Sequence, residues 1–202
     1  MNMTEIVLAS NNKNKLSEIR GILNPGKVRV LSLDDIGFKG DIEETAETLS
    51  GNSLIKARAV WKKAKGRVVI ADDTGLEVDY LAKAPGVYSA RFAGPQCSFE
   101  DNNRKLLKLL KGVKTADRGA VFRTVVAVKY GDETEETYEG RVKGRIALSE
   151  KGEKGFGYDP LFYPETSGKT YAQMLPAEKN SLSHRQKAVL NALKGIRKKL
   201  HI

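Results

Sequence analysis

Regular alternation between short apolar strands and amphipathic helices is the feature that most limits how this chain can fold. Hydrophobic periodicity predicts strands at residues 5–9, 28–32 and 67–72 and helices at about 13–23 and 51–65. This order is typical of α/β proteins, in which helices cover the faces of a sheet. The first half of the chain therefore predicts an α/β fold.

The second half of the chain predicts that the sheet is mixed. Two strand-like segments, 119–130 and 134–144, are separated by a Gly-Asp turn signal, which indicates a long β-hairpin. An amphipathic helix is expected near 99–112. A loop-rich stretch, 149–180, leads to a last helix that begins near Ser183.

Composition limits both the location of the protein and its metal chemistry. The 202 residues suit one domain, or one domain with two lobes. The first residues lack a signal-peptide core and no apolar run is long enough for a membrane span, so a cytosolic location is expected. One cysteine, Cys97, and two histidines cannot complete a structural zinc site. Any catalytic metal is therefore expected to be a hard ion held by oxygen.

A net charge of +10 predicts attraction to polyanions, which include nucleic acid, a membrane surface and a small polyphosphate. The basic segment "RKLLKLLKGVK", residues 104–114, would suit a surface-binding helix. Its leucines also fit one buried face with lysine stems around it, and it lacks the interleaved aromatic residues of a nucleic-acid surface. The buried-face interpretation is favoured, but charge alone does not select the partner.

Two adjacent acids follow the apolar run of the third predicted strand, in "VVIADDTGLEVD". Successive strand side chains point to opposite faces, so at most one of Asp72 and Asp73 faces a given ligand. A carboxylate at the carboxyl end of a strand can hold Mg²⁺ or orient an attacking water. The alternative is an ordinary turn, in which Asp and Gly are common for conformational reasons.

The segment "LASNNKNKLSE" joins the first strand to the first helix. Ser10, Asn11 or Asn12 would cap that helix. The helix start offers backbone N–H groups and a positive dipole end, to which Lys13 and Lys15 add charge, and this combination suits a phosphate. The alternative is a plain N-cap with solvated lysines.

Three further segments place polar or aromatic side chains in loops or at helix starts. They contain Glu44 ahead of a helix that carries Lys56, then Phe156, Tyr158 and Asp159 in "GFGYDPLF", and last Lys179, His184 and Arg185 in "AEKNSLSHRQKA". Aromatic rings can stack on a base, and His and Arg donate to carbonyl or phosphate oxygens. Each segment has a simpler interpretation, as a dipole-compensating acid, a packed loop or a structural histidine.

In this order the five segments resemble the inosine and xanthosine triphosphate pyrophosphatase family nearly end to end. The most specific parts are "ADDTGLEVDYLAKAPGVYSARFAG", "GFGYDPLF" and "SHRQKA". The resemblance implies a single pyrophosphatase domain over residues 1–202, an α/β fold with a mixed, elongated sheet flanked by helices, and two lobes with a central cleft. It also implies Mg²⁺-dependent hydrolysis of ITP, dITP and XTP to the nucleoside monophosphate and pyrophosphate, which cleanses the nucleotide pool.

The resemblance further implies roles for matching residues. Asp73 matches the general base and, with Glu44, the Mg²⁺-binding acids, while Lys56 matches the catalytic lysine near the phosphates. The positions implied to bind substrate are Ser10, Asn11, Asn12, Lys13, Asn14, Lys15, Thr74, Phe156, Gly157, Tyr158, Asp159, Lys179, His184 and Arg185. One departure is Gly51, which stands where the family is often acidic.

The implied partner is a small purine nucleoside triphosphate, without nucleic acid or membrane, and the implied assembly is a cytoplasmic homodimer. Two alternatives stay open. One is a basic nucleic-acid-binding module, which the net charge of +10 would suit. The other is a nucleotide pyrophosphatase that prefers different bases.

Overall fold

The computed structural model describes residues 4–23 and 28–201. These residues form two compact units, and β3, β5 and β6 each contribute residues to both. Unit 1 comprises the described residues of Met1–Asp73, Thr124–Gly140 and Arg185–Ile202, and unit 2 comprises Thr74–Arg123 and Arg141–His184.

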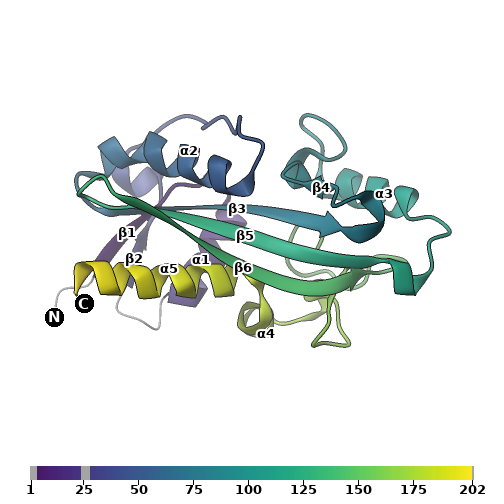
Figure 1. Ribbon diagram of the computed structural model, residues 1–202. Coiled ribbons are helices and arrows are strands. Elements are labelled where there is room, and N and C mark those ends of the chain that lie inside the picture. Colours follow the sequence, from purple (N-terminus) through teal and green to yellow (C-terminus); the bar gives the residue numbers. More distant parts are fainter. Residues whose placement is uncertain (1–3, 24–27, 202) are drawn as a thin grey trace. The chain divides into compact units, whose positions relative to one another are not determined.

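Helices and strands alternate through the first half of the chain (Figure 1). The helices are α1 (Lys13–Leu23), α2 (Leu49–Trp61), α3 (Phe99–Leu109), α4 (Pro176–Leu182) and α5 (His184–Leu200). The strands are β1 (Thr4–Leu8), β2 (Val28–Leu31), β3 (Val68–Val78), β4 (Pro85–Gly86), β5 (Gly119–Lys129), β6 (Glu135–Ile146) and β7 (Phe162–Pro164).

The strands form one mixed sheet. Its order is β2-β1-β3-β5-β6-β7, with β4 paired to β3. β1 runs parallel to β2 and to β3, whereas β4 is antiparallel to β3 and β7 is antiparallel to β6. The expectation of an α/β fold with a mixed sheet flanked by helices is confirmed.

In unit 1 the strands carry apolar side chains on both faces. Ile6 and Leu8 of β1 pack in a cluster with side chains of α1 and α5, while Val7 and Ala9 pack in a second cluster with side chains of α2. Figure 1 shows α2 on one side of these strands and α1 with α5 on the other. Because strand side chains alternate between faces, each position in β1 and β3 is assigned to one of these two layers.

Unit 2 has a core of its own, rich in aromatic rings. Phe122 of β5 packs edge-on against Phe162 of β7, with ring centroids 4.7 Å apart. Tyr171 lies 5.2 Å from Phe162, and Leu106 of α3 and Leu161 complete the buried centre. Aromatic pairs of this geometry add to the stabilisation that their buried area gives.

Element boundaries agree with the sequence expectations in most places and differ in three. The predicted helix 13–23 and the strand near 28–32 are observed, and the predicted helix 51–65 is observed as Leu49–Trp61. The predicted strand 67–72 is wrong at its end, because β3 continues to Val78. The stretch expected to be rich in loops contains β7 and α4. The last helix, expected to begin near Ser183, is observed as α5 from His184, and Ser183 is also the C-cap of α4.

Over residues 4–23 and 28–201, none of the helices has the length and apolar character that crossing a membrane requires.

Candidate active site

The two adjacent aspartates lie inside β3, and their side chains serve different faces of it. Val69 and Ala71 point into the cluster beside α2, and Ile70 points into the cluster beside α1 and α5. By alternation, Asp73 falls on the α2 face and Asp72 on the opposite face. The expectation that the pair separates across the strand is therefore confirmed, although the strand does not end at these acids.

On the α2 face of unit 1, three predicted site residues meet. The Lys56 ammonium lies 2.7 Å from Glu44 Oε1 and 3.1 Å from Asp73 Oδ1. Lys56 belongs to the buried stripe of α2, at the helical spacing that would ordinarily carry apolar residues. A buried charge needs a partner, and here two carboxylates from distant parts of the chain supply it.

Burial and the neighbouring charges shift the pKa values of both Asp73 and Lys56. Burial raises the pKa of Asp73 above its ordinary value, and the Glu44 charge adds to that rise against the opposing effect of Lys56. Burial alone would lower the pKa of Lys56, but the charges of Asp73 and Glu44 outweigh it and raise that pKa. A carboxylate whose pKa is raised is a better proton acceptor near neutral pH.

The donor set fits a hard divalent cation. Glu44 and Asp73 converge on a single cationic group, so their geometry already suits a positive charge between them. In the two described ranges, no group of three or more His, Cys, Asp and Glu side chains gathers as a metal site would require. Mg²⁺ commonly takes only one or two carboxylates and completes its shell with waters and phosphate oxygens, so two acids suffice.

On the opposite face, Asp72 is the centre of a second buried ion cluster in unit 1. Its Oδ2 lies 3.2 Å from Lys15 Nζ and 3.1 Å from Arg185 Nε, and Arg185 Nη1 also bonds Glu18. Burial would raise the pKa of Asp72, but Lys15 and Arg185 hold it well below its ordinary range. Burial in turn lowers the pKa of Lys15, with Asp72 opposing that fall. Asp72 thus connects the first turn of α1 to the start of α5.

The turn before α1 is held by its own side chains. Asn12 caps the helix, because its Oδ1 accepts from the N–H groups of Asn14 and Lys15 at 3.0 and 3.1 Å. Ser10 Oγ accepts from the N–H of Asn12, and the Asn11 amide donates to Gly40 O and Asp41 Oδ1 in the loop that leads to Glu44. The cap predicted for this helix is confirmed. It also occupies two of the N–H groups that a phosphate would otherwise use, which leaves the lysine charges as the main attraction.

In unit 2, the glycine-rich loop is closed around Asp159. Its Oδ2 accepts from the backbone N–H of Phe156 at 2.8 Å and from the Lys179 ammonium at 2.5 Å. Gly155 and Gly157 both have positive φ, and a Cβ at Gly155 would overlap the Asp159 carboxylate. Lys179 also lies 4.9 Å from the ring centroid of Phe156. The structure therefore brings Phe156, Asp159 and Lys179 together.

Two other predicted substrate residues are built into the core of unit 2. Tyr158 is buried, and its hydroxyl donates to Ser89 O at 2.9 Å. His184 is also buried, and its ring stacks on Phe122 with centroids 4.4 Å apart and planes 11° from parallel. Thr74 is the next residue along β3 after Asp73 and is the first residue of unit 2. The phenol of Tyr158 thus has a structural partner already.

Three contributing residues were not found by sequence reasoning. Asn52 of α2 donates to Asp73, Glu18 of α1 pairs with Arg185, and Asn103 of α3 donates to Gly157 O at 3.2 Å. Asn52 and Asn103 are both buried. A polar residue inside an otherwise buried helix stripe is the one sequence signal that would have identified the two asparagines.

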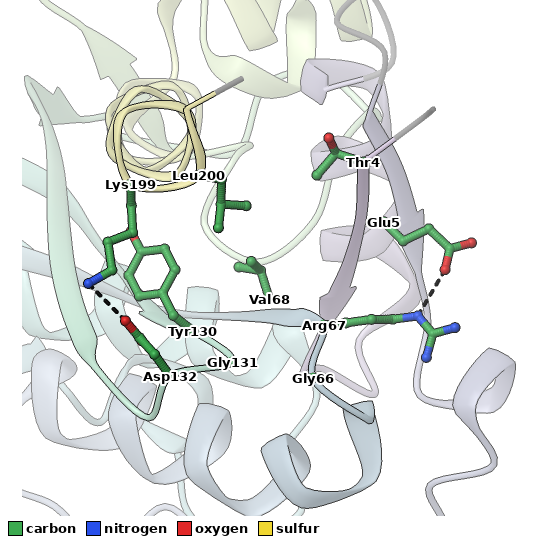
Figure 2. Close-up of a pocket in the computed structure, with 10 residues that line it drawn as sticks. All are labelled: Thr4, Glu5, Gly66, Arg67, Val68, Tyr130, Gly131, Asp132, Lys199 and Leu200. Atoms are coloured by element: carbon green, nitrogen blue, oxygen red, sulfur yellow. Dashed lines mark hydrogen bonds and ion pairs between the residues drawn. The ribbon is translucent and has the colours of Figure 1, made fainter. Parts of the chain in front are cut away.

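Unit 1 also contains a pocket of about 360 Å³ at the beginnings of β1 and β3 (Figure 2). Its charged side chains pair with one another, Glu5 with Arg67 and Asp132 with Lys199, as the dashed lines show. The other lining residues are Thr4, Gly66, Val68, Tyr130, Gly131 and Leu200. This pocket contains none of the predicted site residues.

Comparison with known proteins identifies the family. The model of the Ham1 family matches residues 6–195. This chain belongs to the Ham1 family. It is 48% identical to a dITP/XTP pyrophosphatase of Caldanaerobacter subterraneus subsp. tengcongensis over 198 residues, which is 98% of each chain. It is 46% identical to the dITP/XTP pyrophosphatase of Bacillus subtilis, over 93% of this chain and 94% of that protein.

Solved Ham1 structures share the fold. A HAM1 protein from Coxiella burnetii superposes with a TM-score of 0.84 at 36% identity, covering 97% of this chain and all of that one. The Ham1 protein of Staphylococcus aureus gives 0.82 at 39% identity, covering 97% and 99% of the two chains.

The departure at Gly51 has a local explanation in this Ham1 chain. A Cβ at Gly51 would lie 2.5 Å from the Cβ of Ala46 and 3.1 Å from the hydroxyl oxygen of Thr48. Thr48 caps α2 by accepting from the Gly51 N–H at 3.0 Å. With Ala46 packed at this position, any side chain at 51 would displace the loop that follows Glu44, so glycine is required here.

Proposed function

We propose that this chain hydrolyses dITP, ITP and XTP to the nucleoside monophosphate and pyrophosphate, with Mg²⁺, and so removes noncanonical purine nucleotides. The observation that carries the proposal is the buried cluster in which Lys56 lies between Glu44 and Asp73. The Ham1 relatives named dITP/XTP pyrophosphatase, at up to 48% identity over nearly the full length, support the substrate class.

Phosphate binding is proposed for unit 1. Lys13 and Lys15 add positive charge at the start of α1, and Lys56 carries the charge beside the two acids. Glu44 and Asp73 would hold Mg²⁺, which when bound neutralises phosphate charge and favours departure of pyrophosphate. Lys56 stabilises the charge that develops on the transferred phosphoryl oxygens.

Asp73 is the proposed general base. It accepts a proton from a water whose oxygen attacks the α-phosphorus, while the bond from that phosphorus to the bridging oxygen breaks and pyrophosphate leaves. In the metal-free protein, burial raises the pKa of Asp73 toward the working pH, at which a general base is most effective. An Asp73→Asn variant should therefore lose turnover by orders of magnitude and keep its circular dichroism spectrum. Near-normal turnover would refute the assignment.

Base recognition is proposed for the loop of unit 2. Phe156 would stack on the purine, and Lys179, already ordered by Asp159, holds the loop and adds donors. Donors from this region, from His184 or backbone N–H groups, would pair with the 6-oxygen of hypoxanthine and xanthine. Adenine presents an amino group there, which would leave a buried donor unpaired, and such mismatches discriminate strongly.

A nucleotide panel tests the proposal. Pyrophosphate release is measured from dITP, ITP, XTP, GTP and ATP, each with and without Mg²⁺. The expected result is magnesium-dependent release from the first three and little from ATP. Release that favours another base would indicate a pyrophosphatase of different specificity. No release from any nucleotide, together with salt-sensitive binding of oligonucleotides, would favour a nucleic-acid-binding module.

The single functional domain, the homodimer and the cytoplasmic location stay predictions of the family resemblance. Mass measurement in solution tests the homodimer.

A further inference from the structure

Asn52 is a fully buried polar side chain beside the candidate catalytic carboxylate. It lies on the buried stripe of α2, one helical turn before Lys56, and its relative exposure is 0%. Both polar atoms of its amide are used. Burying an amide without partners would cost free energy, so the bonds that Asn52 makes are the reason it can occupy this position.

The orientation of the Asn52 amide is fixed by its partners. Its Oδ1 accepts from the backbone N–H of Ala46 at 2.8 Å, and its Nδ2 donates to Asp73 Oδ2 at 3.4 Å. Because a backbone N–H can only donate, the carbonyl oxygen must face Ala46 and the NH₂ group must face Asp73.

Asp73 therefore has a different donor on each carboxylate oxygen. Lys56 binds Oδ1, and Asn52 binds Oδ2. Ala46 lies two residues after Glu44, so the same amide that holds Asp73 also holds the segment that carries the second acid. A single side chain thus sets the rotation of one carboxylate and the position of the loop that presents the other.

We propose that Asn52 is a positioning residue for the hydrolytic reaction. Its amide holds Asp73 and the Glu44 segment in the arrangement that binds the divalent cation and directs the carboxylate to the attacking water. The proposal rests on the proposed function. Residues that orient a metal-binding carboxylate through hydrogen bonds typically contribute 10- to 100-fold to metal affinity or activity.

A purely structural role is the alternative, in which Asn52 only fills the α2 stripe and holds the loop. Two variants separate the roles. Asn52→Asp keeps an acceptor for the Ala46 N–H but has no donor for Asp73. Asn52→Leu, which has the same number and branching of side-chain heavy atoms, loses both bonds without adding charge. Asn191→Asp adds the same charge at an exposed position on α5, where the amide donates to Glu139 O, and controls for net charge.

The experiment measures kcat and KM for dITP, the dissociation constant of Mn²⁺ alone, and the hydrogen exchange of the Ala46 amide. For Asn52→Asp we expect kcat to fall about 10- to 100-fold, KM to change less than about twofold and Ala46 exchange to stay slow. For Asn52→Leu we expect a similar loss of kcat, a Mn²⁺ dissociation constant raised about 10- to 100-fold and faster Ala46 exchange. Asn191→Asp should match the wild type.

Wild-type kcat in either Asn52 variant would overturn the proposal. So would fast Ala46 exchange in Asn52→Asp, because the loss of activity would then follow from release of the loop. A wild-type protein that cleaves no nucleotide would refute the proposed function instead. In that case the Mn²⁺ dissociation constant of Asn52→Leu decides the matter, and an unchanged value would overturn the positioning role.

Discussion

The Lys56 ammonium lies between Glu44 and Asp73 and balances their charges. Replacing Lys56 by Met tests whether a bound metal ion can take over this role. Methionine keeps an unbranched apolar side chain, one heavy atom shorter than that of lysine, but removes the charge. Lys56 and Asp73 are each 8% exposed, and Glu44 is 27% exposed, so solvent screens the acids weakly. The variant would leave two carboxylates close together without a counter-charge.

The magnitude follows from the distances. At 2.7 and 3.1 Å, each pair attracts by about 5–6 kcal/mol at an effective dielectric constant of 20, before the cost of removing the charges from water. Measured costs of removing one partner from a buried pair are about 3–5 kcal/mol. We expect Lys56→Met to lower the free energy of unfolding toward the lower end of that range, because Glu44 is partly exposed.

The assay is urea unfolding at pH 7.5 of the wild type, Lys56→Met, Asp73→Asn and the double variant, with and without Mg²⁺. Asp73→Asn removes one of the two charges, so Lys56→Met should cost at least about 1 kcal/mol less in that background. Mg²⁺ at 100 times the dissociation constant of Lys56→Met should restore about 2.7 kcal/mol to that variant, and the same concentration should stabilise the wild type less, because there the Lys56 ammonium competes for the acids. Lys56→Arg, which keeps the charge, is the control. Additive costs in the double variant, or no greater stabilisation by Mg²⁺ in Lys56→Met than in the wild type, would refute the reasoning.

Three further outcomes are expected. Hydrogen bonds from Thr134 and the Lys199 charge lower the pKa of Asp132 to about 2. The stabilisation that Asp132 contributes is therefore present above the ordinary carboxyl range and is lost as the pH falls toward 2. NMR titration, with Asp132→Asn for comparison, checks the value. Gly144→Ala would force a methyl group into a β7 carbonyl oxygen and should cost about 1–3 kcal/mol in urea unfolding, whereas no loss would show that the strands separate easily. Phe156→Ala should raise KM for ITP roughly 5- to 100-fold with kcat nearly unchanged, and an unchanged KM would mean that the ring only packs the loop.

Local periodicity predicted the first half of the fold well. The helix Lys13–Leu23 has its predicted bounds, because its apolar residues repeat at helical spacing and Asn12 supplies a clear cap. The end of β3 was not predicted, since Asp, Thr and Gly are typical of turns. Pairing decided the outcome there: Leu76 and Glu77 of β3 pair with Gly86 and Pro85 of β4, and this partner strand holds β3 extended beyond the acids.

Part of the candidate site, the contacts among the motif residues of unit 1, could be predicted from the sequence. The meeting of Glu44, Lys56 and Asp73 matches the prediction from the family resemblance. The partners of Asp72 were not predictable, because the strand pattern shows only that its side chain points away from that of Asp73. Which cations lie on that face depends on how helices from both ends of the sequence pack there, and no local pattern records it.

The alternation along β3 makes its register a functional constraint. Val68, Val69 and Ile70 align with residues of β1 in a fixed order, and the two neighbouring acids inherit opposite orientations from it. Slippage by one residue would exchange the acids, presenting Asp72 to the lysine of α2 and Asp73 to the arginine of α5. Insertions or deletions in this strand should therefore abolish activity even where the hydrophobic pattern survives.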